Sequence, residues 1–254
     1  MMDEVVFKEL AKPKLNRPIV VEGLPGVGNV GKLAAEHLVD ELEAVKFMEI
    51  YSRHFPPQVL INDDGIIRLV RNELYYHKAK GKELADVILL TGDYQGLSPD
   101  GQYELSWRVL DVLDKFKPRR LYTLGGWGIG KMIEAPRVLG AATDMKLVTD
   151  LKKVGVTFSK GEPGGGIVGA SGLLLGLGKI RGYDGACLMG ETSGYFVDPK
   201  SAEAVLQVLA KALKVKLDFS ALHEKARQID LITSKLKDSE MPPEPKKENL
   251  DYFA

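Results

Sequence analysis

The chain has 254 residues, of which 44% are hydrophobic, so it can bury a substantial core and is too apolar for a disordered protein. Lysine and arginine together number 35, as do aspartate and glutamate, and this zero net charge gives no support to nucleic acid or an anionic membrane as a partner. Low net charge favours association between protein chains, and the 28% of charged residues fits an organism that grows hot.

The N-terminal segment MMDEVVFKEL carries Asp, Glu and Lys where a signal peptide needs an uninterrupted apolar core. No apolar run in the sequence approaches the ~20 residues of a membrane span. We therefore expect a cytoplasmic protein without a membrane partner.

Residues 18–38, PIVVEGLPGVGNVGKLAAEHL, follow the order apolar strand, glycine-rich turn, helix. The strand is expected at Ile19–Glu22. The helix is expected from about Lys32 to Leu42, because apolar residues recur there at helical spacing.

The glycines of this turn match two nucleotide-binding patterns. Gly26 to Gly31 followed by Lys32 has the spacing of a phosphate-binding P-loop. The next residue is Leu33, where a Ser or Thr must ligate magnesium, so we exclude a P-loop. Gly26, Gly28 and Gly31 also match the G-x-G-x-x-G fingerprint of dinucleotide-binding folds.

The dinucleotide interpretation stays open as an alternative, with Glu49 on the second strand as the ribose-binding acid. Two features oppose it: residues 23–25 insert a turn before the first motif glycine, and a hairpin follows where a crossover helix is needed. We favour an architectural role. Gly26 and Gly28 would let the backbone turn tightly, while Gly31 would let the helix pack close to the sheet.

Further elements follow from apolar patterning and turn signals. Asp64-Gly65 lies between two β-rich runs and predicts a hairpin. Four more strands are expected, at Ala44–Tyr51, Asp86–Thr91, Arg120–Leu124 and Ala186–Met189. A helix is expected from about Tyr103 to Phe116. Two glycine-rich stretches, 125–140 and 161–182, lie between the last two of these strands. Alternating strands and helices indicate an α/β fold with a mixed, mainly parallel sheet.

The C-terminal part is expected to be helical and then to change character. Asp198-Pro199 is a helix start with an N-cap and a Pro at the first helical position. A further helix starts at Asp218 or Ser220, with an apolar stripe at Leu222, Ala226, Ile229, Ile232 and Leu236. We expect one domain over residues 1–238 and a flexible tail rich in proline and charge over residues 239–254.

Candidates for chemistry are few. Asp93 and Glu191 each follow a buried strand, where open α/β sheets place functional groups, and either could act as an acid or base. Ser171, in GASGL, lacks both the nucleophile-elbow pattern and an obvious base. The only cysteine, Cys187, lies in an apolar run and is expected to be buried. The histidines lack metal-ligand spacing, so we expect no metal. The loops show no nucleophile–base pair, so we expect neither a cofactor nor catalysis.

Several segments together resemble the PAC2 family of archaeal proteasome assembly chaperone-like proteins. They follow one another over roughly residues 15–220 and are PIVVEGLPGVGNVGKLAAEHLVDEL (18–42), GDYQ (92–95), LYTLGG (121–126), GIVG with SGLLL (166–175), and CLMGET with DPKSA (187–202). The resemblance implies a three-layer sandwich similar to nucleoside-phosphorylase-like folds. It also implies a non-catalytic homo-oligomer, a tetramer or pentamer, that engages the α-subunits of the 20S proteasome.

In this family such binding uses a C-terminal tripeptide of hydrophobic residue, tyrosine and any residue. This chain ends in Tyr252, Phe253 and Ala254, so Phe253 stands where the family has tyrosine and lacks its hydroxyl. Two aromatic rings and a free carboxylate on a flexible arm can fill a pocket and pair with a lysine. Three alternatives remain: an arm that folds back on its own oligomer, another PAC2-family protein as the partner, and a nucleotide- or nucleoside-binding enzyme using Gly26–Gly31.

Overall fold

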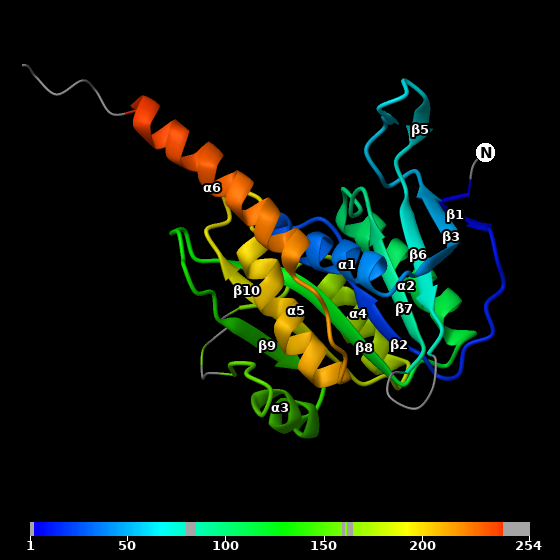
Figure 1. The fold of residues 1–254 in the computed structure, drawn as a ribbon. Coiled ribbons are helices and arrows are strands. Elements are labelled where there is room, and N and C mark those ends of the chain that lie inside the picture. Colours follow the sequence, from blue (N-terminus) through cyan, green and yellow to red (C-terminus); the bar gives the residue numbers. More distant parts are fainter. Residues whose placement is uncertain (1–2, 80–84, 159–160, 162–164, 241–254) are drawn as a thin grey trace, which may run out of the picture.

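In the computed structural model of the protein, the described residues are 3–79, 85–158, 161 and 165–240; of residues 230 and 232–240 it describes the backbone alone. Within these ranges an eight-stranded sheet forms the centre of the molecule (Figure 1). Its strands, from one edge to the other, are β1 (Val5–Glu9), β3 (Val45–Ser52), β6 (Asn72–His77), β7 (Val87–Gly92), β2 (Ile19–Glu22), β8 (Arg120–Gly128), β10 (Gly185–Thr192) and β9 (Val138–Ala142).

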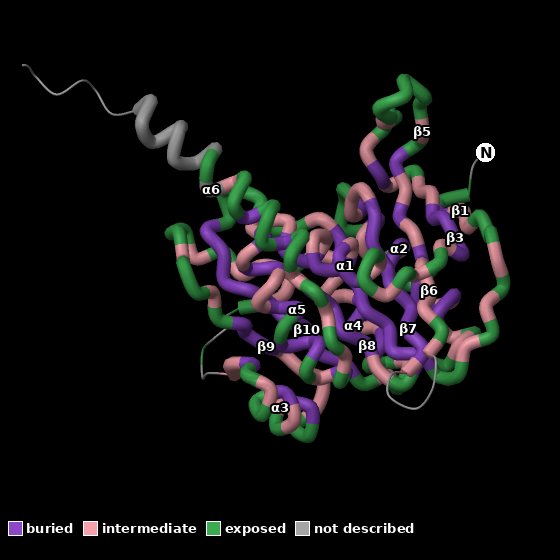
Figure 2. The backbone as a smooth tube through the Cα atoms, in the orientation of Figure 1, coloured by how far each residue is buried: buried purple, intermediate pink, exposed green. Residues whose placement is uncertain are grey.

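The sheet is mixed, as predicted. Strands β7, β2, β8 and β10 run parallel at its centre, whereas the outer strands pair antiparallel. Every residue of β2, β7 and β10 is buried, which is why these segments are continuous apolar runs in the sequence and not alternating ones. Figure 2 shows this buried band through the middle of the molecule.

Helices cover both faces of the sheet and complete the expected three-layer sandwich (Figure 1). One face carries α1 (Val30–Glu41) and α5 (Pro199–Leu213), with α6 (Ser220–Glu240) packed on α5. The other carries α2 (Pro99–Asp114) and α4 (Ala170–Ile180), which also contact each other. A short helix, α3 (Met145–Lys152), lies beside β9.

Two hydrophobic clusters, one on each face, hold these layers together. Successive residues of a strand point to opposite faces, so Val21 and Leu188 pack under α1 and α5, while Val20 and Cys187 pack under α2 and α4. The chain is therefore a double-sided α/β core, and polar groups that enter it must find partners inside.

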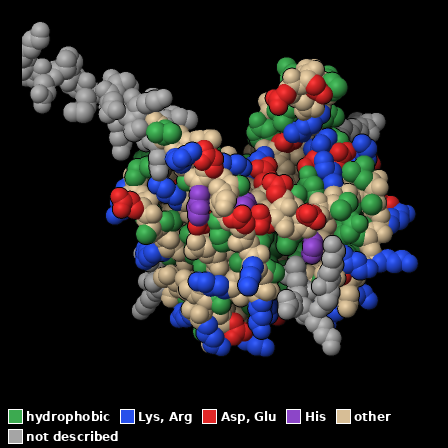
Figure 3. Space-filling model, in the orientation of Figure 1, with side chains coloured by type: hydrophobic (Ala, Val, Ile, Leu, Met, Phe, Trp, Pro, Cys, Tyr) green, Lys and Arg blue, Asp and Glu red, His purple; other side chains and the backbone are tan. Residues whose placement is uncertain are grey.

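The predicted hairpin at Asp64-Gly65 is confirmed. It joins β4 (Val59–Ile61) to β5 (Ile67–Leu69), which form a small separate sheet. Gly65 adopts a φ of 80°, and the Asp64 carboxylate accepts a hydrogen bond from the Ile66 amide at 3.0 Å. The hairpin stands out from the body of the molecule and carries exposed hydrophobic side chains (Figure 3).

The starts of α5 and α6 agree with the sequence prediction, whereas α1 and α2 begin earlier than predicted. Asp198 caps α5 by accepting from the Ser201 amide at 2.9 Å, and α6 begins at Ser220. Helix α2 begins at Pro99, ahead of the expected start, because Ser98 accepts a hydrogen bond from the Gly101 amide and caps the helix there.

The glycine-rich stretches contain more regular structure than predicted. Strand β8 continues past Leu124 to Gly128, since β10 pairs with it along that whole length. Strand β9 and helices α3 and α4 lie in segments where no element was expected, as does β1 at the N-terminal edge. In each case a tertiary partner supplies the hydrogen bonds or buried contacts that local propensity does not.

The expected tail lies almost wholly outside the described residues. Helix α6 continues to Glu240, two residues into the segment expected to be tail, and residues 241–254 are not described. Among the helices that the structure describes, none has the length and hydropathy needed to cross a membrane.

Candidate functional site

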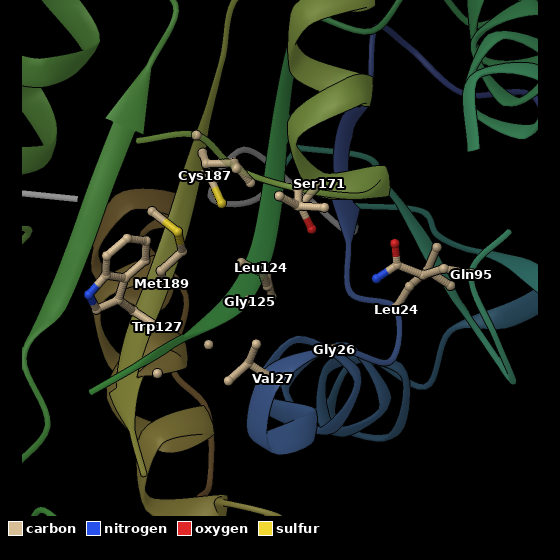
Figure 4. Close-up of a pocket in the computed structure, with 15 residues that line it drawn as sticks. Leu24, Gly26, Val27, Gln95, Leu124, Gly125, Trp127, Ser171, Cys187 and Met189 are labelled. Atoms are coloured by element: carbon tan, nitrogen blue, oxygen red, sulfur yellow. The ribbon is translucent and has the colours of Figure 1, made fainter. Parts of the chain in front are cut away.

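A pocket of about 390 Å³ opens at the carboxyl ends of β8 and β10, beside the first turn of α4 (Figure 4). The glycine turn after β2 forms one wall, through Leu24 and Val27. Opposite it lie Trp127 from β8 and Met189 from β10, and Ser171 of α4 closes the end between them. Carboxyl ends of parallel strands are where open α/β sheets bind ligands, so this pocket is the candidate functional site.

Two glycines of the turn have the architectural role that the sequence predicts. Gly28 adopts a φ of 61°, and a Cβ there would lie 2.7 Å from the Thr192 hydroxyl oxygen. A Cβ on Gly31 would lie 2.2 Å from the Leu124 carbonyl oxygen, so only glycine lets α1 begin this close to β8.

Gly26 does not fit that prediction. Its φ of −162° is extended backbone, which does not require glycine, and a Cβ would have room, with Gln95 Nε2 as its nearest neighbour at 3.8 Å. The expectation that Gly26 is needed for a tight turn is therefore wrong. Gly26 instead lines the pocket.

A buried carboxyl lies behind the pocket wall. Glu22, the last residue of β2, is 1% exposed, and its two oxygens accept hydrogen bonds from the Leu24 amide at 3.1 Å and the Ser171 hydroxyl at 3.0 Å. Burial raises the pKa of Glu22 to about 7, although both hydrogen bonds favour the ionised form and lower it. Glu22 is therefore a carboxyl that can change its charge near neutral pH.

A row of polar groups continues from Glu22 across the sheet. In the strand register Glu22 is opposite Thr123, and Thr123 is opposite Cys187. Cys187 is fully buried, as predicted, and burial raises the pKa of its thiol to about 12, so it is uncharged at neutral pH.

Ser171 gains a partner that the sequence does not reveal. The segment around it shows no base, yet folding brings the Glu22 carboxyl, 149 positions away in sequence, within hydrogen-bond distance. No histidine occurs among the described residues lining the pocket, so the serine–histidine relay of acyl-transfer enzymes is not assembled. The Ser171 hydroxyl, held by Glu22, is a polar group in this part of the mainly apolar pocket wall.

Gln95 ties the two sides of the pocket together. Its Nε2 donates to the Pro25 carbonyl at 2.7 Å, and its Oε1 accepts from the Ala170 amide at 2.9 Å. One side chain thus links the glycine turn to the start of α4. This accounts physically for the Gln at the end of the GDYQ segment.

Asp93 and Glu191, the two candidate acids or bases, are both held in ion pairs. Burial alone would raise the pKa of Asp93, but its contacts with the Arg68 guanidinium, including one of 2.9 Å, hold that pKa below its ordinary value. The Arg137 guanidinium and amide likewise hold the pKa of Glu191 below its ordinary range. Neither carboxylate is among the described pocket-lining residues, so neither belongs to the candidate site.

The positions of Glu49 and Lys32 also do not fit a role in nucleotide binding. Strands β6 and β7 separate β3, which carries Glu49, from β2, whereas a dinucleotide fold needs these two strands adjacent. Glu49 accepts from Lys8 and Tyr51 instead. Lys32 Nζ donates to the Gly92 carbonyl at 2.9 Å and so caps β7.

The described residues contain no group of three or more His, Cys, Asp or Glu side chains that could hold a metal ion. The predicted protein-binding residues, Tyr252, Phe253 and Ala254, lie outside the described residues.

Comparisons with known proteins place the chain among archaeal relatives. The model of the PAC2 family matches residues 20–237. The crystal structure of Pyrococcus furiosus PbaB, described as an archaeal proteasome activator, has a TM-score of 0.89 and 43% identity, and covers 93% of this chain and 100% of its own. That of PbaA from the same organism, described as an archaeal homolog of proteasome-assembly chaperone, has a TM-score of 0.77 and 28% identity over 93% of each chain. The uncharacterized protein MJ1210 of Methanocaldococcus jannaschii is 41% identical over 223 residues, which are 88% of this chain and 84% of that relative.

Proposed function

Because this chain belongs to the PAC2 family, we propose that it is a homo-oligomeric chaperone or activator of the archaeal 20S proteasome. The single observation that carries this proposal is the likeness to PbaB, which extends over the whole of that activator's length. Balanced charge favours self-association, and the family suggests a tetramer or pentamer.

We propose that the chain binds and does not catalyse. The carboxylates at two strand ends, Asp93 and Glu191, are engaged by arginines and held ionised, which removes them as proton donors at neutral pH. Ser171 faces a carboxyl without an intervening imidazole. These features support a binding protein over the alternative of a nucleotide- or nucleoside-dependent enzyme.

The contact with the proteasome is proposed to run through Tyr252, Phe253 and Ala254 and to reach the α-subunits. Aromatic side chains can fill an apolar pocket between subunits, and the terminal carboxylate can pair with a lysine or be captured by backbone amides. Loss of the tyrosine hydroxyl at Phe253 removes one hydrogen bond, which is worth about 0.5–1.5 kcal/mol, and leaves the ring and carboxylate contacts in place.

Capture of purified archaeal 20S particles by immobilised protein tests this proposal. Full-length protein is expected to capture the particles, and a version lacking Tyr252 to Ala254 is expected to lose capture. Phe253→Tyr should strengthen capture by about 2- to 10-fold through the added hydrogen bond. Asp251→Ala is the matched tail control, because it leaves the last three residues unchanged.

The outcomes separate the alternatives. Equal capture by the full-length and truncated proteins would rule out docking through the tail while keeping proteasome association. No capture by either would contradict the proteasome as a direct partner, and would favour another PAC2-family protein in that role. Peptide hydrolysis by the 20S particle, measured with and without the protein, distinguishes an activator from an assembly chaperone.

A further inference from the structure

The pocket beside α4 has the size and the mainly apolar lining of a small-molecule binding site. Its volume of about 390 Å³ lies within the range of known ligand pockets, ~300–1,000 Å³. Its apolar lining includes Leu24, Val27, Leu124, Trp127, Ile167 and Met189. None of its described lining residues carries a charge, and Glu22, when ionised behind Ser171, adds a negative one. No described lining side chain can pair with a phosphate or a carboxylate, and an uncharged molecule fits.

Two glycines in the wall are not required by the fold. Gly26 has extended backbone and room for a Cβ. Gly125 lies within β8, where glycine weakens a strand, and the nearest neighbour of a Cβ there would be Met189 at 3.9 Å. Gly125 pairs with Met189 in register, so a side chain at this position would enter the pocket. Both glycines keep open a space that side chains could have filled, which is expected where a ligand approaches the backbone.

The polar groups of the pocket restrict what can bind. The Gln95 amide makes one hydrogen bond at each end, to Pro25 and from Ala170, which fix its orientation and leave it one N–H and one lone pair. The Ser171 hydroxyl donates its proton to Glu22, so the lone pairs of its oxygen remain to accept. A molecule that makes a hydrogen bond to the Ser171 oxygen needs an N–H or O–H donor.

From these walls we propose that the pocket binds an uncharged aromatic molecule with a ring N–H, for which indole, smaller than the pocket, serves as the probe. Its ring fills the apolar space between Val27 on one side and Trp127 and Met189 on the other (Figure 4). Its N–H donates to the Ser171 oxygen. This site is separate from the proposed tail contact, and the proposal does not rest on proteasome binding.

Three matched probes test the three parts of the proposal by calorimetric titration of the full-length protein. Indole is planar, uncharged and has the N–H. Benzofuran has the same shape without the donor, and indole-5-carboxylate adds a charge. Indole is expected to bind best, benzofuran about 2- to 10-fold more weakly for the loss of one neutral hydrogen bond, and the carboxylate not measurably.

Variants locate the binding. Ser171→Ala should bring indole to the affinity of benzofuran and leave benzofuran unchanged. Gly125→Val and Gly26→Val each fill the pocket from a different element and should abolish binding of both probes. Ser106→Ala is the matched control, because Ser106 is buried and does not line this pocket. Circular dichroism checks whether each variant is folded. If one of the two pocket-filling variants does not fold, the other still provides the test.

Three outcomes would overturn the proposal. The first is no binding of indole by the wild-type protein at millimolar concentration. The second is indole binding that survives in a folded filling variant, which would place it elsewhere. The third is equal affinity for indole and indole-5-carboxylate, which would contradict an uncharged ligand. Proteasome capture by the Gly125→Val variant should be unchanged, so the two proposals fail independently.

Discussion

At the scale of single residues, Glu22 shows how burial and hydrogen bonding compete. The carboxyl has two good donors, yet removal from water outweighs them and raises its pKa to about 7 from 4.5. Ionising Glu22 therefore costs more free energy in the folded protein than in the unfolded chain.

This difference predicts how stability depends on pH. Because the folded pKa lies above the unfolded one, the contribution of Glu22 is fully present below pH ~4.5 and is lost as pH rises through ~7. The glutamine of Glu22→Gln cannot ionise. The difference in unfolding free energy between this variant and wild type should therefore shift by about 3 kcal/mol in favour of the variant as the pH rises from 4.5 to 8. Denaturant unfolding at several pH values measures this.

Glu104→Gln, at a half-buried position on α2 outside the core, is the control and should give a curve parallel to that of wild type. If the Glu22→Gln curve is also parallel over this range, the carboxyl does not titrate near neutrality.

At residue scale the candidate site was only partly predictable. The strand–turn–helix segment was recognised from its glycines, and the roles of Gly28 and Gly31 were predicted correctly. The contact between Glu22 and Ser171 was not predicted, because 149 positions separate the two residues and neither belongs to a sequence motif that includes the other. Glu22 ends an apolar strand, which is the one local signal that could have indicated a buried acid.

At the scale of elements, helix α5 depends on a cap visible in the sequence. Asp198 accepts from the Ser201 amide at 2.9 Å, and Pro199 sets the first helical position. Asp198→Ala removes this acceptor and should lower the unfolding free energy by about 1 kcal/mol, within ~0.5–2.

Chemical denaturation at pH 7 checks this, and the denaturant slope should stay constant because the folded core is unchanged. Asp198→Asn keeps a capping oxygen and should stay within a few tenths of a kcal/mol of wild type. A loss in Asn as large as in Ala would mean that the carboxylate's charge, and not its hydrogen bond, stabilises α5.

Helix α4 was not predicted, and the reason is physical. Its interior contains Gly172, Gly176 and Gly178, and each glycine costs a helix about 1 kcal/mol relative to alanine. Buried contacts of Leu174 and Leu175 with the core under α2 offset that cost. A Cβ on Gly172 would also lie 2.2 Å from the Ile167 carbonyl oxygen, so close packing requires glycine where propensity disfavours it.

At the scale of the whole molecule, the proposed function depends on several tails acting together. A single peptide segment that must become ordered on binding binds weakly, because that ordering costs conformational entropy. Several arms on one symmetric particle, facing a symmetric ring, raise the apparent affinity without any new contact.

We therefore expect the native oligomer to bind 20S particles about 10²- to 10⁴-fold more tightly than a synthetic peptide of residues 241–254. Surface plasmon resonance on immobilised 20S particles compares the two. Native mass spectrometry, run first, gives the number of subunits and hence of tails. Equal affinities would show that the arms do not act together, and a monomeric mass would contradict the oligomer itself.

The sequence by itself determined the fold class, the core strands β2, β7 and β10, the hairpin, the start of α5 and the family. These features depend on apolar runs, turn residues and caps, which act over a few neighbouring positions. Only the tertiary structure decided the length of β8, the existence of α4, and the pocket that Ser171 and Gln95 line, with Glu22 behind its wall. Those depend on strand pairing and burial between segments far apart in the chain, and no local pattern records such contacts.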